Sequence, residues 1–317
     1  MPADESGPLP HGLLPHGLLS RLAARPWLWP GPDELAGPAL VGPALLAADL
    51  AVLRDSGYLT LALPSRIDGA GLSLTEVACA QRQLAAHAPA TARAVNAHHA
   101  WAGAAADALA SGDVTDPGPG WILGEAARGR VFAGFGAGLD PETPHVLPPD
   151  WDWLALRSVD TREPGRPAVV YGFVGRTSGD FRPVARQPLG APGTQGSTLI
   201  AGMHAWGLSL AGMTSYAIAR RTFDLAVTRA QRAGLSLDRW PVAEASLRLD
   251  DMRGQLDEVV AGWRQRVGAG GGVTSLDPGR LGLIRQFTAR HVAAGGAQRV
   301  MDLAALIAGD PVTAARA

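Results

Sequence analysis

The residues with the clearest capacity for chemistry lie in a glycine-rich segment, Gly134–Asp140, which reads GFGAGLD. Glycines let the backbone approach a bound group closely, so main-chain N–H groups in such a segment can cradle a ligand. A tight connection after a β-strand needs the same residue types. Both interpretations stay open on the sequence alone.

Histidines offer a second kind of chemistry. His204, with Trp206 two residues later, could act as an acid/base beside an aromatic wall, although packing in the core is the default for both. His98 and His99 are neighbours on a predicted helix, where adjacent side chains point about 100° apart. They cannot readily chelate one metal ion, and we expect one at the edge of the core and the other in solvent.

Other catalytic patterns are weaker. The run Gly207–Ala211 approximates the nucleophile elbow G-x-S-x-G, but Gly-Leu-Ser-Leu occurs three times in the chain and no parallel sheet is predicted around it. We therefore disfavour a hydrolase. The only cysteine, Cys79, excludes a multi-cysteine metal site and falls in a predicted helix, where a small buried residue is expected. The sequence contains no P-loop, dinucleotide fingerprint or HExxH motif.

Composition narrows the class of protein. The 317 residues suffice for two or three domains, and a net charge of −1 gives no reason to expect nucleic acid or an anionic membrane as a partner. No apolar run has the length of a membrane span, and the first residues lack the basic region of a signal peptide. We expect a cytoplasmic protein.

The elements that must position these residues are organised around Ser56–Glu76. Gly57 predicts the end of one helix, and the apolar run Tyr58–Leu63 is expected to cross the core. The glycines of Asp68–Gly71 then predict a sharp turn, and Ser73 with Glu76 forms a capping-box pattern that begins the next helix.

The rest of the chain divides into four parts. An arm rich in proline and tryptophan (1–33) precedes a helical domain (34–129). Short alternating runs between glycine and proline turns predict a small β domain (130–197). Helical periodicity over Thr198–Ala233, Pro241–Val267 and Leu276–Gly309 predicts a bundle in the last part (198–317).

The helix–glycine turn–helix segment and this domain order resemble the acyl-CoA dehydrogenase superfamily, in a divergent and shortened form. The resemblance covers nearly all of the chain beyond Leu35. It implies a mainly α fold with a small central β domain and a C-terminal helical bundle. It also implies an FAD cofactor, an acyl-thioester or related small-molecule substrate, and a homo- or hetero-oligomer, the latter with a full-length paralogue.

The same resemblance implies which residues hold the flavin. Gly136, Gly138 and Asp140 match the family's flavin-contacting strand, although its Thr, Glu and Ser are replaced here. Arg239 lies where family members grip the dinucleotide across a dimer interface. On the last predicted helix, Arg285 and Gln286 could meet phosphate, or could form a solvated or subunit-interface face.

The family's catalytic base has no counterpart in this chain. Abstraction of an α-proton needs a carboxylate in a dry pocket. No Asp or Glu occurs from Phe181 to Phe223, and after Asp302 the only carboxylate is Asp310. Two hypotheses follow: a divergent flavoprotein oxidoreductase, for which flavin-dependent oxygenation suits a site without a base, or a non-catalytic or flavin-free subunit that pairs with a paralogue.

Overall fold

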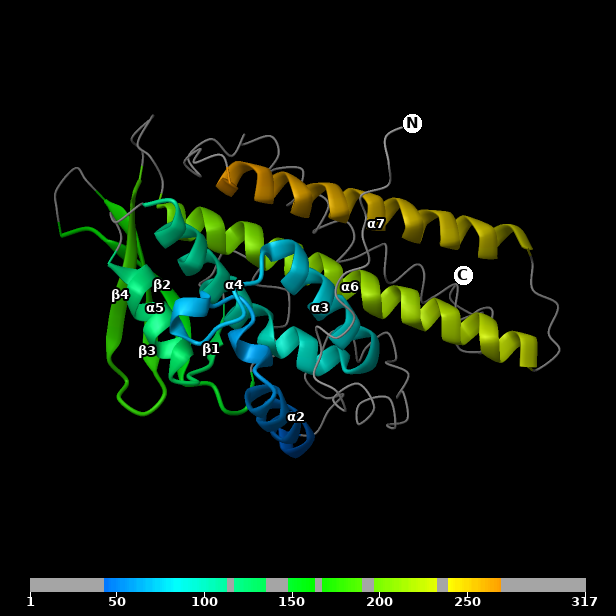
Figure 1. Ribbon diagram of the computed structural model, residues 1–317, viewed down its shortest axis with the longest axis horizontal. Coiled ribbons are helices and arrows are strands. Elements are labelled where there is room, and N and C mark those ends of the chain that lie inside the picture. Colours follow the sequence, from blue (N-terminus) through cyan, green and yellow to red (C-terminus); the bar gives the residue numbers. More distant parts are fainter. Residues whose placement is uncertain are drawn as a thin grey trace.

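The structure is a computed structural model in which helices form an elongated body with a small sheet at one end (Figure 1). This is the mainly α architecture with a small β part that the sequence predicts. The predicted arm at 1–33 and the predicted helix Leu276–Gly309 lie outside the described residues, and the domain boundaries stay predictions. The structure describes residues 43–112, 117–134, 148–162, 167–189, 197–232 and 239–268.

The connector after the first helix follows the predicted order. Helix α2 (Pro43–Asp55) ends, and Gly57 takes the left-handed φ of 73° that stops it. The apolar run then winds into a short 3-10 helix, η2 (Tyr58–Thr60), and Leu63 beyond it is fully buried. The run therefore enters the core as a tight helical turn.

The turn before α3 depends on the backbone conformations of Asp68 and Gly69. The 3-10 helix η3 (Ser65–Ile67) ends at Asp68, which has a φ of 60°. At Gly69 a Cβ atom would collide with the Leu63 carbonyl, so only glycine fits there. Helix α3 (Leu74–His87) then begins with the predicted capping box of Ser73 and Glu76.

Helix α4 (Pro89–Ala110) is the centre of the helical layer. It contacts α3, α6, α5 (Gly118–Ala127) and the sheet, and its most extensive contact is with α6 (Thr198–Arg232). Alanine and glycine on most of its faces let neighbouring helices approach closely. As a result α4 is buried on nearly every side.

The described residues form a sheet of four strands in sequence order. Strand β1 (Phe132–Ala133) pairs in parallel with β2 (Trp153–Asp160), and β2, β3 (Ala168–Gly175) and β4 (Phe181–Pro188) are antiparallel neighbours. A two-residue strand such as β1 is weakly held by pairing alone. Its position therefore depends on what lies on its other edge.

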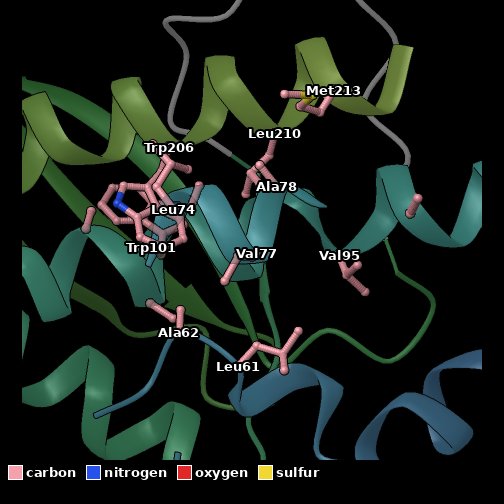
Figure 2. Packing of buried hydrophobic residues seen from close by; sticks show 14 of the residues in the cluster. Leu61, Ala62, Leu74, Val77, Ala78, Val95, Trp101, Trp206, Leu210 and Met213 are labelled. Atoms are coloured by element: carbon pink, nitrogen blue, oxygen red, sulfur yellow. The ribbon is translucent and has the colours of Figure 1, made fainter. Parts of the chain in front are cut away.

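The long helices α6 and α7 (Arg239–Gly268) run antiparallel along the long axis of the molecule (Figure 1). Figure 2 shows Leu210 of α6 close to Ala78 of α3, at the α3–α6 contact in the middle of the core. Both helices carry polar residues among the apolar ones. No helix in the described ranges is long and apolar enough to cross a membrane.

Candidate functional site

The glycine-rich segment begins at Gly134, directly after β1. Gly134 follows the strand with a φ of 72°, in the left-handed region that favours glycine. A Cβ atom at this position would lie 3.2 Å from Leu154 Cδ1 and 3.4 Å from the Ala155 carbonyl oxygen of β2. Both the positive φ and the close approach to β2 therefore favour glycine at this position.

Two side chains of α4 bind the backbone of this strand end. The amide N–H of Phe132 donates to His98 Nδ1 over a long 3.4 Å, and Trp101 Nε1 donates to the Gly134 carbonyl at 3.0 Å. His98 Nε2 lies 2.8 Å from the Leu59 carbonyl of η2. His98 thus links η2, α4 and β1 through one fully buried ring.

Aromatic rings pack under this strand end. Phe132 stacks on His98 with 5.9 Å between centroids and meets Phe173 of β3 at 4.9 Å, and Phe173 also packs edge-on against Trp101 at 4.9 Å. Trp121 of α5 extends the cluster toward the surface, where the Arg182 guanidinium lies over its ring. The cluster keeps water away from the polar contacts of His98 and Trp101.

Burial makes His98 a neutral residue. Desolvation lowers its pKa to about 4; Arg54 lowers it too, whereas the Leu59 carbonyl and Asp152 act in the opposite direction. His99 is also fully buried, and desolvation with the adjacent His98 holds its pKa well below the usual range. Both imidazoles are therefore uncharged around neutral pH.

This burial predicts acid sensitivity. A histidine that is hard to protonate in the fold stabilises it fully above the unfolded pKa of about 6.5, and that contribution is lost as pH falls toward the folded pKa. For His98 alone, the free energy of unfolding is expected to drop by about 2 kcal/mol between pH 7 and pH 5. Urea unfolding across this range measures the drop. In His98→Gln the free energy of unfolding should fall by about 2 kcal/mol less between pH 7 and pH 5. The same pH dependence in the variant and the parent would contradict the prediction.

The expectation that one of the two histidines faces solvent is wrong. His99 has both ring nitrogens without a hydrogen-bond partner among the described residues, and its ring packs edge-on against Tyr58 at 5.2 Å. The reason is that α4 packs against other elements on several sides. His98 and His99 point about 100° apart around the helix, and both directions meet a neighbouring element.

Beside His99, a buried polar network joins four elements. Tyr58 donates to Gln81 of α3 at 2.6 Å, and Gln81 donates to Asn96 of α4 at 2.6 Å. Thr214 of α6 reaches the same Asn96 oxygen at 3.3 Å. Because a buried polar group without a partner is costly, these bonds fix the relative rotation of the helices.

A separate contact, centred on a carboxylate, lies further along α4. Oδ2 of Asp107 accepts hydrogen bonds from the indole N–H groups of Trp206 on α6, at 2.7 Å, and of Trp263 on α7, at 2.9 Å. Burial raises the pKa of Asp107, and the two indole bonds oppose that rise. One oxygen atom thus ties three helices together.

Two of the predicted site residues, His204 and Arg239, belong to described elements. Arg239 is the first residue of α7, which begins at the end of the molecule far from the sheet (Figure 1). His204 is half-buried on α6 and lies about 200° around the helix from Trp206, which packs on Gly103 of α4. The other predicted cofactor residues, outside the described ranges, are Gly136, Gly138, Asp140, Arg285 and Gln286.

A helical layer, a small sheet after it and a long helical pair after the sheet define the acyl-CoA dehydrogenase-like fold. Solved structures confirm that the chain has this fold. A nitrososynthase from Micromonospora carbonacea var. africana is 16% identical over 93% of this chain and 84% of its own, with a TM-score of 0.63. Methanesulfinate monooxygenase MsuC from Pseudomonas fluorescens is 15% identical over 94% and 87%, with a TM-score of 0.59.

TdsC from Paenibacillus sp. A11-2, in a complex with FMN and indole, is 17% identical over 85% of this chain and 82% of its own, with a TM-score of 0.54. No protein-family model and no curated protein matches the chain. The likeness to solved structures therefore establishes the fold, and the fold resemblance that the sequence suggested is correct.

The described residues at the end of β1 fix the point at which the glycine-rich segment starts. The backbone there is held by two side chains from a buried helix, and apolar rings pack beneath it. A rigid strand end holds a binding segment more accurately than a free loop does. Within the described ranges, no cluster of three or more histidine, cysteine or acidic side chains could hold a metal ion.

Sequence reasoning missed the functional contacts of His98, Trp101 and Asp107. Two signals were present. His98 and Trp101 have the i, i+3 spacing of one helix face, and Asp107 is the only acidic residue in an otherwise alanine-rich helix. A lone carboxylate in such a helix is a reason to look for buried partners.

Proposed function

We propose that this chain is a flavin-dependent oxidoreductase that acts on a small molecule, and that it catalyses oxygenation rather than desaturation of an acyl thioester. The fold carries this proposal, because the similar structures include a methanesulfinate monooxygenase and a TdsC complex with FMN and indole. Their shared architecture supports a flavin enzyme. The carboxylates of this chain bear on whether the reaction is oxygenation or desaturation.

The distribution of carboxylates favours oxygenation. The stretch from Phe181 to Phe223, which includes the first half of α6, contains no Asp or Glu. A bound, reduced flavin supplies two electrons to dioxygen, so that one oxygen atom enters the substrate and the other leaves as water. This reaction requires no protein carboxylate to abstract a carbon-bound proton.

In this proposal Gly136, Gly138 and Asp140 contact the cofactor, since they follow the strand end that His98 and Trp101 hold. Arg239 begins α7 at the opposite end of the same chain, so its contact to cofactor phosphate requires a second subunit (Figure 1). Arg285 and Gln286 are further phosphate ligands. The cofactor is FMN or FAD, and an arginine that acts across subunits favours an oligomer.

We expect the purified protein to bind flavin. The measurement is a visible absorption spectrum, followed by titration of the flavin-free protein with FMN and with FAD. Substitution Gly138→Val should weaken binding of both by about tenfold or more, because a side chain keeps the backbone away from the ligand. Arg239→Gln should weaken FAD more than FMN if it meets the dinucleotide phosphate.

The matched control is Arg253→Gln, on the exposed part of the same helix, where the guanidinium pairs only loosely with Asp257 at 3.5 Å. This variant should bind flavin like the parent. A colourless protein that also ignores added FMN and FAD would contradict the proposal. It would favour the flavin-free subunit that pairs with a paralogue.

A further inference from the structure

Among the described strands, β1 pairs on one edge only, with β2. The Val131 carbonyl accepts from the Trp153 amide N–H of β2 at 3.1 Å, and β1 is the outermost strand of the sheet. In an extended chain the N–H and C=O groups of alternate residues point to the same side. The Phe132 N–H therefore points to the edge opposite β2, and the Gly134 carbonyl, just beyond the strand, faces α4.

That free edge meets α4 instead of another strand. His98 accepts from the Phe132 N–H, and Trp101 donates to the Gly134 carbonyl. Being three residues apart, the two side chains lie on one face of the helix. Helix α4 thus supplies one acceptor and one donor to the edge of β1 that does not face β2.

We propose that His98 and Trp101 are positioning residues that replace a neighbouring strand for β1 and so fix the backbone from which the flavin-binding segment leaves. The inference rests on the proposed function for its link to flavin. The two hydrogen bonds to Phe132 and Gly134 are a property of the protein itself and can be measured without a cofactor.

The chemistry of the imidazole defines its role. A carbonyl oxygen can only accept, so the contact with Leu59 requires the proton on His98 Nε2. The lone pair is then on Nδ1, where it accepts from the Phe132 N–H. A glutamine amide also carries an NH₂ donor group and an oxygen acceptor close together, and it does not titrate. His98→Gln is therefore the conservative variant, and His98→Leu removes both bonds.

Amide hydrogen exchange tests the hold directly. In His98→Leu the Phe132 amide should exchange about tenfold faster relative to the Val95 amide in the same protein, and His98→Gln should restore most of the protection. Normalising to Val95 removes any change in global stability. If His98→Leu does not yield folded protein, Trp101→Phe, which keeps an aromatic ring and removes the indole N–H, should loosen the same strand end.

A nitrogen-15 spectrum of the histidine rings gives an independent check on the parent protein. It should show His98 as the neutral tautomer with the proton on Nε2. The matched control is His99→Gln, the adjacent and equally buried residue, which has no hydrogen-bond partner among the described residues. This variant should leave the normalised Phe132 exchange unchanged. Equal loosening by His98→Leu and His99→Gln would overturn the proposal, as would the opposite tautomer.

The flavin readout separates this proposal from the proposed function. If the parent binds flavin, His98→Leu and Trp101→Phe should raise the flavin Kd by about tenfold, and His98→Gln should stay close to the parent. If the parent binds no flavin, the proposed function fails, while the exchange of Phe132 still decides the positioning role. A variant whose Phe132 amide exchanges faster but whose flavin Kd is unchanged would overturn the proposal that the end of β1 positions the cofactor.

Discussion

Replacing Asp107 with leucine is expected to lower the free energy of unfolding by about 3 kcal/mol. The carboxylate oxygen accepts from two indole N–H groups, and both tryptophan rings are almost fully buried. Leucine has the same branched shape but accepts nothing, so Trp206 and Trp263 would each keep a buried donor without a partner. Urea unfolding followed by tryptophan fluorescence measures the loss.

Asp107→Asn is the matched variant. Both indoles bind the same oxygen, so one amide oxygen can replace it without the cost of a buried charge. This variant should stay within about 1 kcal/mol of the parent. If leucine proves as well tolerated as asparagine, Asp107 does not hold the three helices together.

The pH dependence gives a second signature of Asp107. Its folded pKa is raised by burial, so its contribution to stability is greatest below the unfolded pKa of about 3.8 and is lost as pH rises through the folded pKa. The sign is opposite to that of His98. As pH falls, Asp107 adds stability while the buried histidines lose it. Asp107→Asn removes only the gain from Asp107, so the free energy of unfolding should fall more steeply toward acid pH.

Gly103→Ala is expected to cost about 3 kcal/mol, although alanine is the better helix former. A Cβ atom at position 103 would lie 2.5 Å from Cε3 of Trp206, inside the indole ring's contact distance. Trp206 cannot swing away without breaking its bond to Asp107. The added methyl group must therefore push α6 away from α4, which thermal unfolding would register.

Gly254→Ala on α7 is the control for this substitution. Its Cβ atom would meet nothing within 4 Å, so the variant should gain about 0.5–1 kcal/mol from helix propensity. A double-mutant cycle completes the test, since Gly103→Ala should cost much less when Trp206 is already leucine. Equal effects of Gly103→Ala in both backgrounds would mean that the contact with Trp206 is not the cause.

Local chemistry made much of the fold predictable. The stop at Gly57 and the capping box of Ser73 and Glu76 are decided by neighbours within a few residues, and both occur as expected. Strands β2 to β4 and helices α6 and α7 also follow from hydrophobic periodicity. The run Tyr58–Leu63 was harder, because an apolar stretch of six residues does not distinguish a tight turn from an extended segment.

The sequence by itself thus determined the order of helices and strands, the glycine-rich segment after β1 and the missing carboxylates near α6. It could not determine the partners of α4, because alanine and glycine on most of its faces leave no apolar stripe to orient it. Only the tertiary structure placed His98 against β1 and Asp107 between two tryptophans, since those partners are about 30 to 160 residues away in the chain.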